Sequence, residues 1–300
     1  MRAAVTGSSG FVGRHLVPFL RSHGDDVVTI DRTGTPSVDV TDAAEVREVL
    51  RAARPDAVYH LAALSHIGRS WDAPETVFRV NALGALNVLR ACADAGAHRV
   101  LVAGSADVYG VVGPEDLPLT EESPIRPVTP YGASKAAADV LALQAFLGDG
   151  LATLRVRAFN HTGPGQSASM LVPGLAQRIA DAERDEGNKV RVGRIDVVRD
   201  LSDVRDVVRA YRLLVEHGTP GEAYNVCSGH GVSVREVADT MLATSDAPLE
   251  LVVDPELVRP VDVPRLVGDP ARLRAATGWE PEIPLDETLR DVLAAARAPR

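Results

Sequence analysis

The sequence predicts an α/β fold: a doubly wound parallel sheet with a second, smaller α/β domain beside it. Two observations carry this prediction. Short apolar runs alternate with longer helical patterns through the first half of the chain, and a glycine-rich turn joins the first run to the first helix. Strands joined by helices lie parallel, and runs that are almost wholly apolar are typical of a sheet covered by helices on both faces.

The expected elements follow one another in a regular order. We expect strands at residues 3–6, 27–30, 57–60, 100–103 and 154–158. We expect helices between them at residues 11–22, 42–53, 74–95 and 130–147. A further helix and strand are expected at 204–216 and 223–226, and helical patterns recur at 170–183, 234–243 and 285–296.

The glycine-rich turn has the chemistry of a phosphate cradle. Gly7 permits a tight turn, Gly10 lets the backbone approach a pyrophosphate, and Gly13 lets the helix pack on the sheet. Three glycines alone are a weak signal, but these follow a strand and precede a helix, as dinucleotide binding requires. The cofactor-binding residues expected here are Gly7, Ser9, Gly10, Phe11, Val12 and Gly13.

The end of the second expected strand bears on which dinucleotide binds. Asp31 stands near the place where an acid hydrogen-bonds a ribose diol, and its charge would repel a 2′-phosphate. Arg32 beside it could instead hold that phosphate. We therefore favour NAD(H), with NADP(H) as the alternative.

The chain changes character after Asn160, where Pro and Gly become frequent and arginine-rich stretches follow. We expect residues 1–160 plus 204–227 to form the dinucleotide-binding domain. Residues 161–203 plus 228–300 should form the smaller substrate domain.

Composition excludes several classes of function. With 45% hydrophobic and 24% charged residues, the 300-residue chain is typical of a globular protein. Its net charge of −9 disfavours nucleic acid as a partner. Cys92 and Cys227 form no disulfide framework, and no Cys/His spacing predicts a metal site. No apolar run suits a membrane span and no secretory leader is apparent, so we expect a cytoplasmic protein.

A tyrosine and a lysine mark the expected chemistry. Tyr131 and Lys135 are four residues apart on an expected helix, so they share one face. An adjacent ammonium would lower the pKa of the phenol, which could then exchange a proton with a carbonyl oxygen. Lys135 and Lys189 are the only lysines among 32 basic residues, which favours a role that arginine cannot take. Ser105, just past a central strand, could hydrogen-bond the same oxygen.

Taken together, these motifs resemble the extended short-chain dehydrogenase/reductases that modify nucleotide sugars, also described as the NAD-dependent epimerase/dehydratase family. The resemblance covers essentially the whole chain. It implies that Ser105, Tyr131 and Lys135 form the catalytic set, and that Asn81 braces the lysine or its water from the neighbouring helix. Further cofactor contacts implied by the resemblance are Asp31, Arg32, Asp39, Val40, Leu61, Ala62, Ala63, Asn81, Tyr131, Lys135 and Phe159.

The C-terminal half is similar to the branch of that family that reduces GDP-4-keto-6-deoxy-D-mannose. By that likeness a few arginines would grip a nucleotide diphosphate, since guanidinium groups donate two hydrogen bonds to phosphate at once. The substrate-binding residues so implied are Ser65, His66, Ser105, Asn160, Arg191, Arg199, Asn225, Arg259 and Asp262.

Asp107 bears on the choice between reduction and dehydration. The related 4,6-dehydratases place a Glu here with a polar residue before it, whereas this chain has Asp107 after Ala106. Alanine cannot donate or accept a proton, so one member of the acid–base pair needed for elimination of water is missing. Ketone reduction does not need that pair. We include Asp107 with the expected catalytic residues.

We therefore expect hydride transfer from NAD(P)H to the C4 ketone of a nucleotide-linked 4-keto-6-deoxyhexose. The alternatives are a 4-epimerase or 4,6-dehydratase with tightly held NAD, and a non-catalytic sensor of NAD(H) or a nucleotide sugar. The helices at 74–95 and 130–147 are apolar around much of their circumference, and the family pairs such helices in a homodimer.

Overall fold

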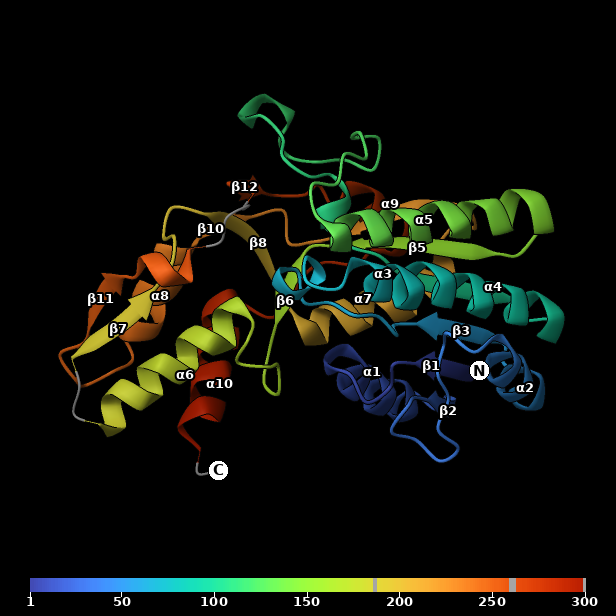
Figure 1. Ribbon diagram of the computed structural model, residues 1–300, viewed down its shortest axis with the longest axis horizontal. Helices are drawn as coiled ribbons and strands as arrows, with labels where there is room; N and C mark the ends of the chain where they lie inside the picture. The colour runs from blue at the N-terminus through green and yellow to red at the C-terminus, as the bar shows by residue number, and fades with distance from the viewer. Residues whose placement is uncertain (186–187, 259–262, 299–300) are drawn as a thin grey trace.

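The computed structural model describes residues 1–185, 188–258 and 263–298, and it confirms the doubly wound parallel sheet (Figure 1). The six strands lie in the order β2-β1-β3-β4-β5-β9 and all pair in parallel. They are β1 (Arg2–Thr6), β2 (Asp26–Ile30), β3 (Ala57–His60), β4 (Arg99–Ala103), β5 (Thr153–Ala158) and β9 (Ala223–Val226). Their carboxyl ends therefore meet at one edge of the sheet.

Helices cover both faces of this sheet. One face carries α1 (Phe11–Ser22) and α7 (Val204–His217), and the other carries α2 (Ala43–Ala53), α4 (Gly84–Ala95) and α5 (Pro130–Asp149). Successive strand residues serve the two cores in turn, as the period of two requires: Val5 packs with α1 and α7, and Ala4 with α2 and α4. No helix in the described ranges is long and apolar enough to cross a bilayer.

The helix expected at 74–95 is interrupted. It consists of α3 (Pro74–Phe78), one π-helical turn at Arg79–Leu83, and α4. The π turn carries Asn81, which is 2% exposed. Bulges of this kind are frequent at functional sites, and here the bulge turns a polar side chain toward α5. Short 3₁₀ turns lie at Gly68–Ser70, Ala106–Val108, Pro114–Asp116 and Pro255–Leu257.

The second unit has a core of its own. Its helices are α6 (Leu171–Arg184), α8 (Val234–Leu242) and α10 (Leu285–Arg297), packed against β7 (Lys189–Val192) and β8 (Val198–Asp203). The strands β6 (Asn160–Thr162), β10 (Gly231–Ser233) and β12 (Arg265–Leu266) pair with β8, and β11 (Glu250–Val253) pairs with β7. This unit lies at one end of the sheet (Figure 1).

Part of the chain assigned by sequence to the substrate domain packs on the other unit. Leu273 in α9 (Ala271–Thr277) and Trp279 are both 0% exposed in the core beneath α1 and α7. The indole Nε1 of Trp279 donates to the backbone oxygen of Asp206 at 3.0 Å. A buried aromatic ring needs both an apolar pocket and a polar partner for its N–H, and α7 provides both. The expected boundary of 228–300 is therefore wrong for this segment.

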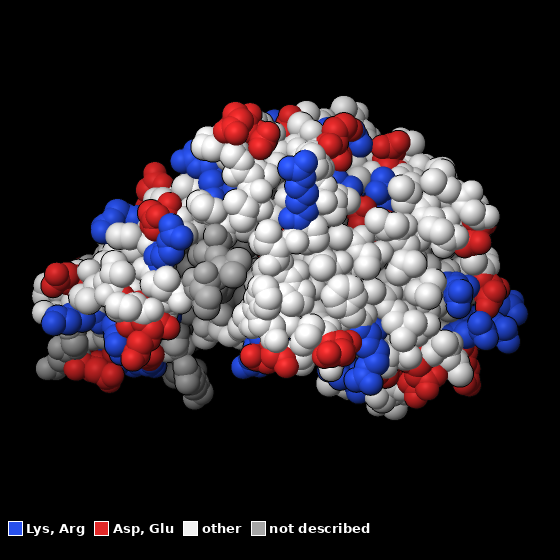
Figure 2. Space-filling view, turned by 45° about the horizontal axis from the view of Figure 1, so that its top comes forward, with Lys and Arg blue, Asp and Glu red and all other residues white. Residues whose placement is uncertain are grey.

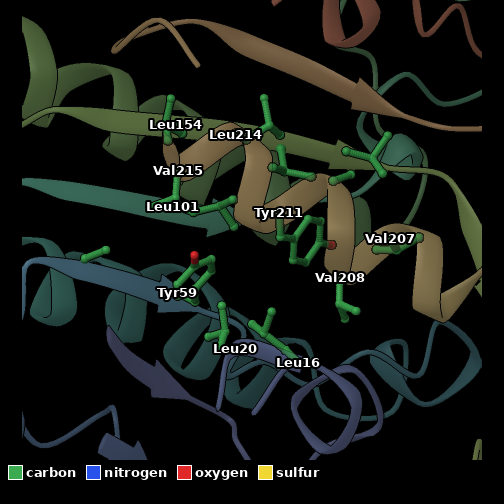
Figure 3. Close-up of a cluster of buried hydrophobic side chains, with 14 of the residues drawn as sticks. Leu16, Leu20, Tyr59, Leu101, Leu154, Val207, Val208, Tyr211, Leu214 and Val215 are labelled. Atoms are coloured by element: carbon green, nitrogen blue, oxygen red, sulfur yellow. The ribbon is translucent and has the colours of Figure 1, made fainter. Parts of the chain in front are cut away.

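The core beneath α1 and α7 contains one tyrosine, Tyr59, whose hydroxyl is buried without a hydrogen-bond partner (Figure 3). Tyr59 is fully buried among leucines and valines, and its hydroxyl oxygen has no hydrogen-bond partner. An unpaired buried hydroxyl lowers stability. We expect Tyr59→Phe to leave the free energy of unfolding unchanged or to raise it by about 1 kcal/mol, as measured by urea denaturation.

Tyr109→Phe is the matched control, because the Tyr109 hydroxyl donates to Asn225 Oδ1 at 2.7 Å and accepts from Arg157 Nη1 at 3.2 Å. Loss of this hydroxyl leaves its buried partners unpaired and should lower the free energy of unfolding by about 1–3 kcal/mol. Equal destabilisation by the two substitutions would contradict this account of Tyr59.

Candidate active site

The turn between β1 and α1 is shaped as a cradle that side chains would fill. Gly7 has φ +70°, and a Cβ there would lie 2.7 Å from the backbone nitrogen of Ala62. A Cβ on Gly13 would lie 2.4 Å from the Gly7 oxygen. Gly10 caps α1 without a side-chain hydrogen bond, so the first amides of the helix remain open to an anion. The turn fits a dinucleotide pyrophosphate.

Asp31 is held against this turn. Its carboxylate accepts from the Ser9 amide at 3.0 Å and from the amide and hydroxyl of Thr33 at 3.2 Å each. Burial raises the pKa of Asp31, but these hydrogen bonds outweigh it and hold the pKa below its usual value. Asp31 is therefore ionised where a ribose diol would lie.

Asp39 lies near two cations at the same end of the cradle. The Thr41 amide donates to Asp39 Oδ1 at 2.8 Å. This bond, together with the charges of Arg32 and Arg79, lowers the pKa of Asp39 despite partial burial. The sequence analysis named Arg32 and missed Arg79, which follows α3 at the start of the π turn.

Other expected cofactor residues border the cradle or lie beneath it. Leu61 donates its amide to the Thr6 oxygen at 3.2 Å, and Ala62 abuts Gly7. Val40 is buried under Gly84 of α4. The Phe159 side chain is 2% exposed in the core, with its amide bonded to Val226 and its oxygen to His161. The Phe159 side chain therefore faces the core, and its contact with a cofactor stays a prediction.

Ser105, Asp107 and Tyr131 come together at the carboxyl end of β4. Ser105 caps the 3₁₀ turn at Ala106–Val108, and its hydroxyl donates to Asp107 Oδ2 at 2.9 Å. Tyr131 stands in the first turn of α5 and shares a hydrogen bond with Ser105. The Thr129 side chain caps that helix by accepting from the Gly132 amide at 2.9 Å.

The pKa of Tyr131 departs from the sequence-based expectation. Burial raises it, the charge of Asp107 raises it further, and the hydrogen bond with Ser105 offsets only part. Lys135 does not lower the pKa of Tyr131, because its Nζ is turned to the backbone oxygen of Ala103 at 2.7 Å. Tyr131 is thus a phenol that keeps its proton at neutral pH.

Lys135 itself is strongly affected by burial. Desolvation lowers its pKa to about 8. The ammonium in turn adds to the effect of burial on His60, whose pKa falls to about 3. His60 is therefore a neutral side chain. Its Nδ1 forms a hydrogen bond with Thr6 Oγ1 at 2.8 Å.

Asn81 braces α5 rather than the lysine. Its amide nitrogen donates to Ser134 Oγ at 2.9 Å and to the Leu64 oxygen at 3.1 Å, and its oxygen accepts from the Leu64 amide at 2.8 Å. The expected contact with Lys135 is thus replaced by one with the residue before it. Asn81 positions Lys135 through the backbone of α5.

A pocket of about 310 Å³ adjoins this set. Of the expected substrate residues it contains Ser65, His66, Asn160 and Arg199, together with Asp107. Arg199 is anchored by hydrogen bonds from Nη1 to the backbone oxygens of Val198 and Val263, at 2.9 and 2.7 Å. Residues from both units therefore form one pocket wall.

Two expected substrate residues lie elsewhere. Asn225 is 0% exposed, and its side chain bonds Tyr109 and the Leu119 oxygen, so its role is structural. Arg191 projects from the outer face of β7 and pairs with Asp254 at 2.8 Å. Neither side chain lines the pocket; burial rules out the expected contact for Asn225, and that for Arg191 stays a prediction. Arg259 and Asp262 lie outside the described residues.

The pocket contains two arginines that the sequence analysis missed, Arg178 and Arg194. The Arg178 Nε is buried without a hydrogen-bond partner, and burial lowers the pKa of this guanidinium. Arg178 shares the apolar face of α6 with Leu171 and Leu175, both of which line the pocket. An arginine at apolar spacing on a helix was the signal available in the sequence. In the described ranges, no group of three or more metal-ligating side chains is present.

Comparison with known proteins identifies the family. Residues 35–292 match the family described as GDP-mannose 4,6 dehydratase. The chain belongs to that family, within the extended short-chain dehydrogenase/reductases. It is 37% identical to a GDP-6-deoxy-D-mannose reductase of Pseudomonas aeruginosa, over 98% of this chain and 96% of the relative.

Solved relatives share the whole fold. The structure of RMD from Pseudomonas aeruginosa complexed with NADPH superimposes with a TM-score of 0.90 at 37% identity, covering 99% of this chain and 97% of the other. A UDP-glucose 4-epimerase of Thermus thermophilus in complex with NAD has a TM-score of 0.88 at 31% identity, covering 99% of both chains. Family members thus use NADPH or NAD.

The buried lysine predicts a dependence of stability on pH. The unfolded chain holds the Lys135 proton to a pKa near 10.5 and the folded chain only to about 8, so stability gains from this group as pH rises between them. Relative to Lys135→Met, the natural protein should gain about 3 kcal/mol from pH 7 to pH 10.5, measured by urea denaturation at each pH.

Lys189→Met is the matched control, because Lys189 is exposed on β7. The difference in the free energy of unfolding between Lys189→Met and the natural protein should stay constant from pH 7 to pH 10.5. A flat difference for Lys135→Met as well would show that Lys135 is not desolvated.

Proposed function

We propose that this protein is an NAD(P)H-dependent reductase of a nucleotide-linked 4-keto-6-deoxyhexose, with GDP-4-keto-6-deoxymannose as the preferred substrate. One observation carries the proposal: a protonated phenol, Tyr131, lies with Ser105 and Asp107 beside a pocket that holds Arg178, whose Nε is buried without a partner. The similarity to the Pseudomonas aeruginosa reductase supports the choice of substrate.

The state of Tyr131 suits reduction rather than oxidation. A nicotinamide cofactor, when bound, supplies the hydride. Carbonyl reduction also needs a proton at the oxygen, and Tyr131, which is protonated at neutral pH, would donate it. The Ser105 hydroxyl donates to Asp107, which orients it. A second hydrogen bond joins Ser105 to Tyr131 and orients the phenol.

Lys135 is assigned to the cofactor rather than to the phenol, because its Nζ is turned to the Ala103 oxygen and does not lower the pKa of Tyr131. We propose that its ammonium would bind the nicotinamide ribose. With a pKa of about 8, Lys135 is mostly charged at neutral pH, and Ala103 and Asn81 together fix its position.

The same residues argue against dehydration. Elimination of water needs a second acid–base pair beside the tyrosine, and Ala106, which is 1% exposed, has no proton to exchange. Asp107 is already engaged with Ser105. Its placement next to Tyr131 assigns it to holding the proton on the phenol.

A diphosphate would lie toward the second unit. Arg178 and Arg199 reach the pocket from α6 and β8, and α6 begins there without a side-chain cap. Open helix amides and guanidinium groups are the donors that phosphate oxygens prefer. Asn160, at the start of β6, adds a side-chain amide to the same wall.

For the cofactor we propose a preference for NADH, with NADPH also accepted. Ionised Asp31 disfavours a 2′-phosphate, while Arg32 and Arg79, which act on nearby Asp39, supply positive charge to the same end of the cradle. The buried free thiols Cys92 and Cys227 suit the reducing cytoplasm, which we propose as the location.

The direct test supplies GDP-4-keto-6-deoxymannose with NADH or NADPH and follows cofactor absorbance. We expect net cofactor oxidation, and we expect Tyr131→Phe to lower kcat by about 10²- to 10⁴-fold while GDP still binds. Turnover of an unmodified GDP- or UDP-hexose without net oxidation would indicate a dehydratase or epimerase instead. An inert protein that binds both ligands would be a sensor.

We also propose a homodimer through α4 and α5. Between Asp139 and Asp149, α5 carries no charged residue, yet Val140 is 56% and Leu147 73% exposed. Phe78 and Leu83 add exposed apolar surface just before α4. Figure 2 shows how few charges lie over the middle of the larger lobe. A helix that is apolar all round is normally buried, and a second copy would bury this one.

Val140→Arg places a charge in that face. We expect the natural protein to run as a dimer in light scattering and Val140→Arg as a monomer at the same micromolar concentration. Lys189→Glu on β7, exposed in the second unit and away from this face, should remain dimeric. A monomeric natural protein would rule out the dimer.

A further inference from the structure

One aromatic contact joins the helix of the cradle to the wall of the pocket. The ring of Phe11, the first residue of α1, lies parallel to that of His161, with centroids 6.2 Å apart and an interplanar angle of 6°. His15, one turn further along α1, packs edge-on to Phe11 at 5.4 Å. Its Nε2 lies 3.0 Å from the Pro164 oxygen, to which it donates because a carbonyl only accepts.

His161 is held in one orientation. Its Nδ1 lies 3.0 Å from the Phe159 oxygen, so that nitrogen carries the hydrogen. Burial lowers the pKa of His161 despite this hydrogen bond, and the ring is therefore neutral at pH 7. One edge of the ring is tied to the end of β5, and one face rests on Phe11.

The segment after His161 transmits its position to the pocket. Thr162 Oγ1 donates to Gln166 Oε1 at 2.8 Å, and Gln166 Nε2 donates back to the His161 oxygen at 3.0 Å. Asn160, His161, Thr162 and Gln166 all line the pocket. The backbone at Gly163 packs directly on α7, because a Cβ there would lie 2.6 Å from Val204. These contacts link residues 160–166 of the pocket wall to one another and to α7.

Phe11 also belongs to the cradle. It directly follows Gly10, the cap of α1, so its backbone amide is in the first helical turn, where an anion is expected. The same residue therefore has its backbone at the pyrophosphate and its ring on the pocket wall.

We propose that the Phe11–His161 contact couples the two ligand sites, so that a dinucleotide on the cradle fixes the 160–166 wall and tightens the binding of the nucleotide sugar. This inference rests on the proposed function, since it assigns the pocket to a nucleoside diphosphate. By linkage the effect is reciprocal: the nucleotide must tighten dinucleotide binding by the same factor. Both residues are positioning residues.

The experiment measures this factor by calorimetry on the full chain, with GDP and NADPH as probes. GDP is titrated with and without saturating NADPH, and the ratio of the two Kd values is the coupling factor. We expect a ratio of about fivefold or more for the natural protein. Phe11→Leu and, independently, His161→Leu should reduce it to within twofold of unity.

Phe19→Leu is the matched control. Phe19 packs on His23 with centroids 4.3 Å apart, at the other end of α1 and away from the pocket, so its loss should preserve the natural ratio. Thermal unfolding without ligands separates a loss of fold from a loss of coupling, and either test variant suffices if the other does not fold.

The outcomes distinguish the two proposals. A ratio near unity in the natural protein, or an unchanged ratio in folded Phe11→Leu or His161→Leu, overturns the coupling while leaving the proposed function intact. Absence of GDP binding at any NADPH concentration overturns both.

Discussion

Parallel pairing of the six central strands is the constraint on which the site depends. Because every strand runs the same way, the ends of β1, β3, β4 and β5 open at one edge. Residues that are distant in the chain are thereby brought together: Gly7 meets Ala62, and Ser105 meets the first turn of α5. Reversal of any one strand would remove its contribution to the site.

Burial at this edge decides the protonation of the groups gathered there. His60 is neutral, Lys135 has a pKa of about 8, and Tyr131 keeps its proton. Each shift has desolvation as its largest cause, and each favours the uncharged form. Carbonyl reduction needs a proton donor, and a protonated phenol beside the charged Lys135 can supply one. The backbone oxygen of Ala103 satisfies the lysine without neutralising it.

The second unit is assembled from separate segments, and buried aspartates tie them to the sheet. Asp200, which is 0% exposed, accepts from the amides of Ser228, Gly229 and Gly268. Asp206 accepts from the amides of Glu282 and Ile283, just past Trp279. Each carboxylate holds segments that are distant in the chain, and these ties fix the geometry of the pocket.

The sequence by itself determined the parallel sheet, the glycine turn after its first strand and the start of the helix that carries Tyr131. These depend on local rules: apolar runs of strand length, glycines where a Cβ would collide, and capping residues such as Thr129. The small strands of the second unit escaped prediction because runs of two to six residues carry too little periodicity.

Only the tertiary structure decided the direction in which side chains project and the cost of burying them. It turned Arg191 outward and Arg178 inward, closed Asn225 into the core, and moved α9 onto the other unit. It also reversed the expected pKa shift of Tyr131, because desolvation depends on every neighbour in space and not on the residue four positions away.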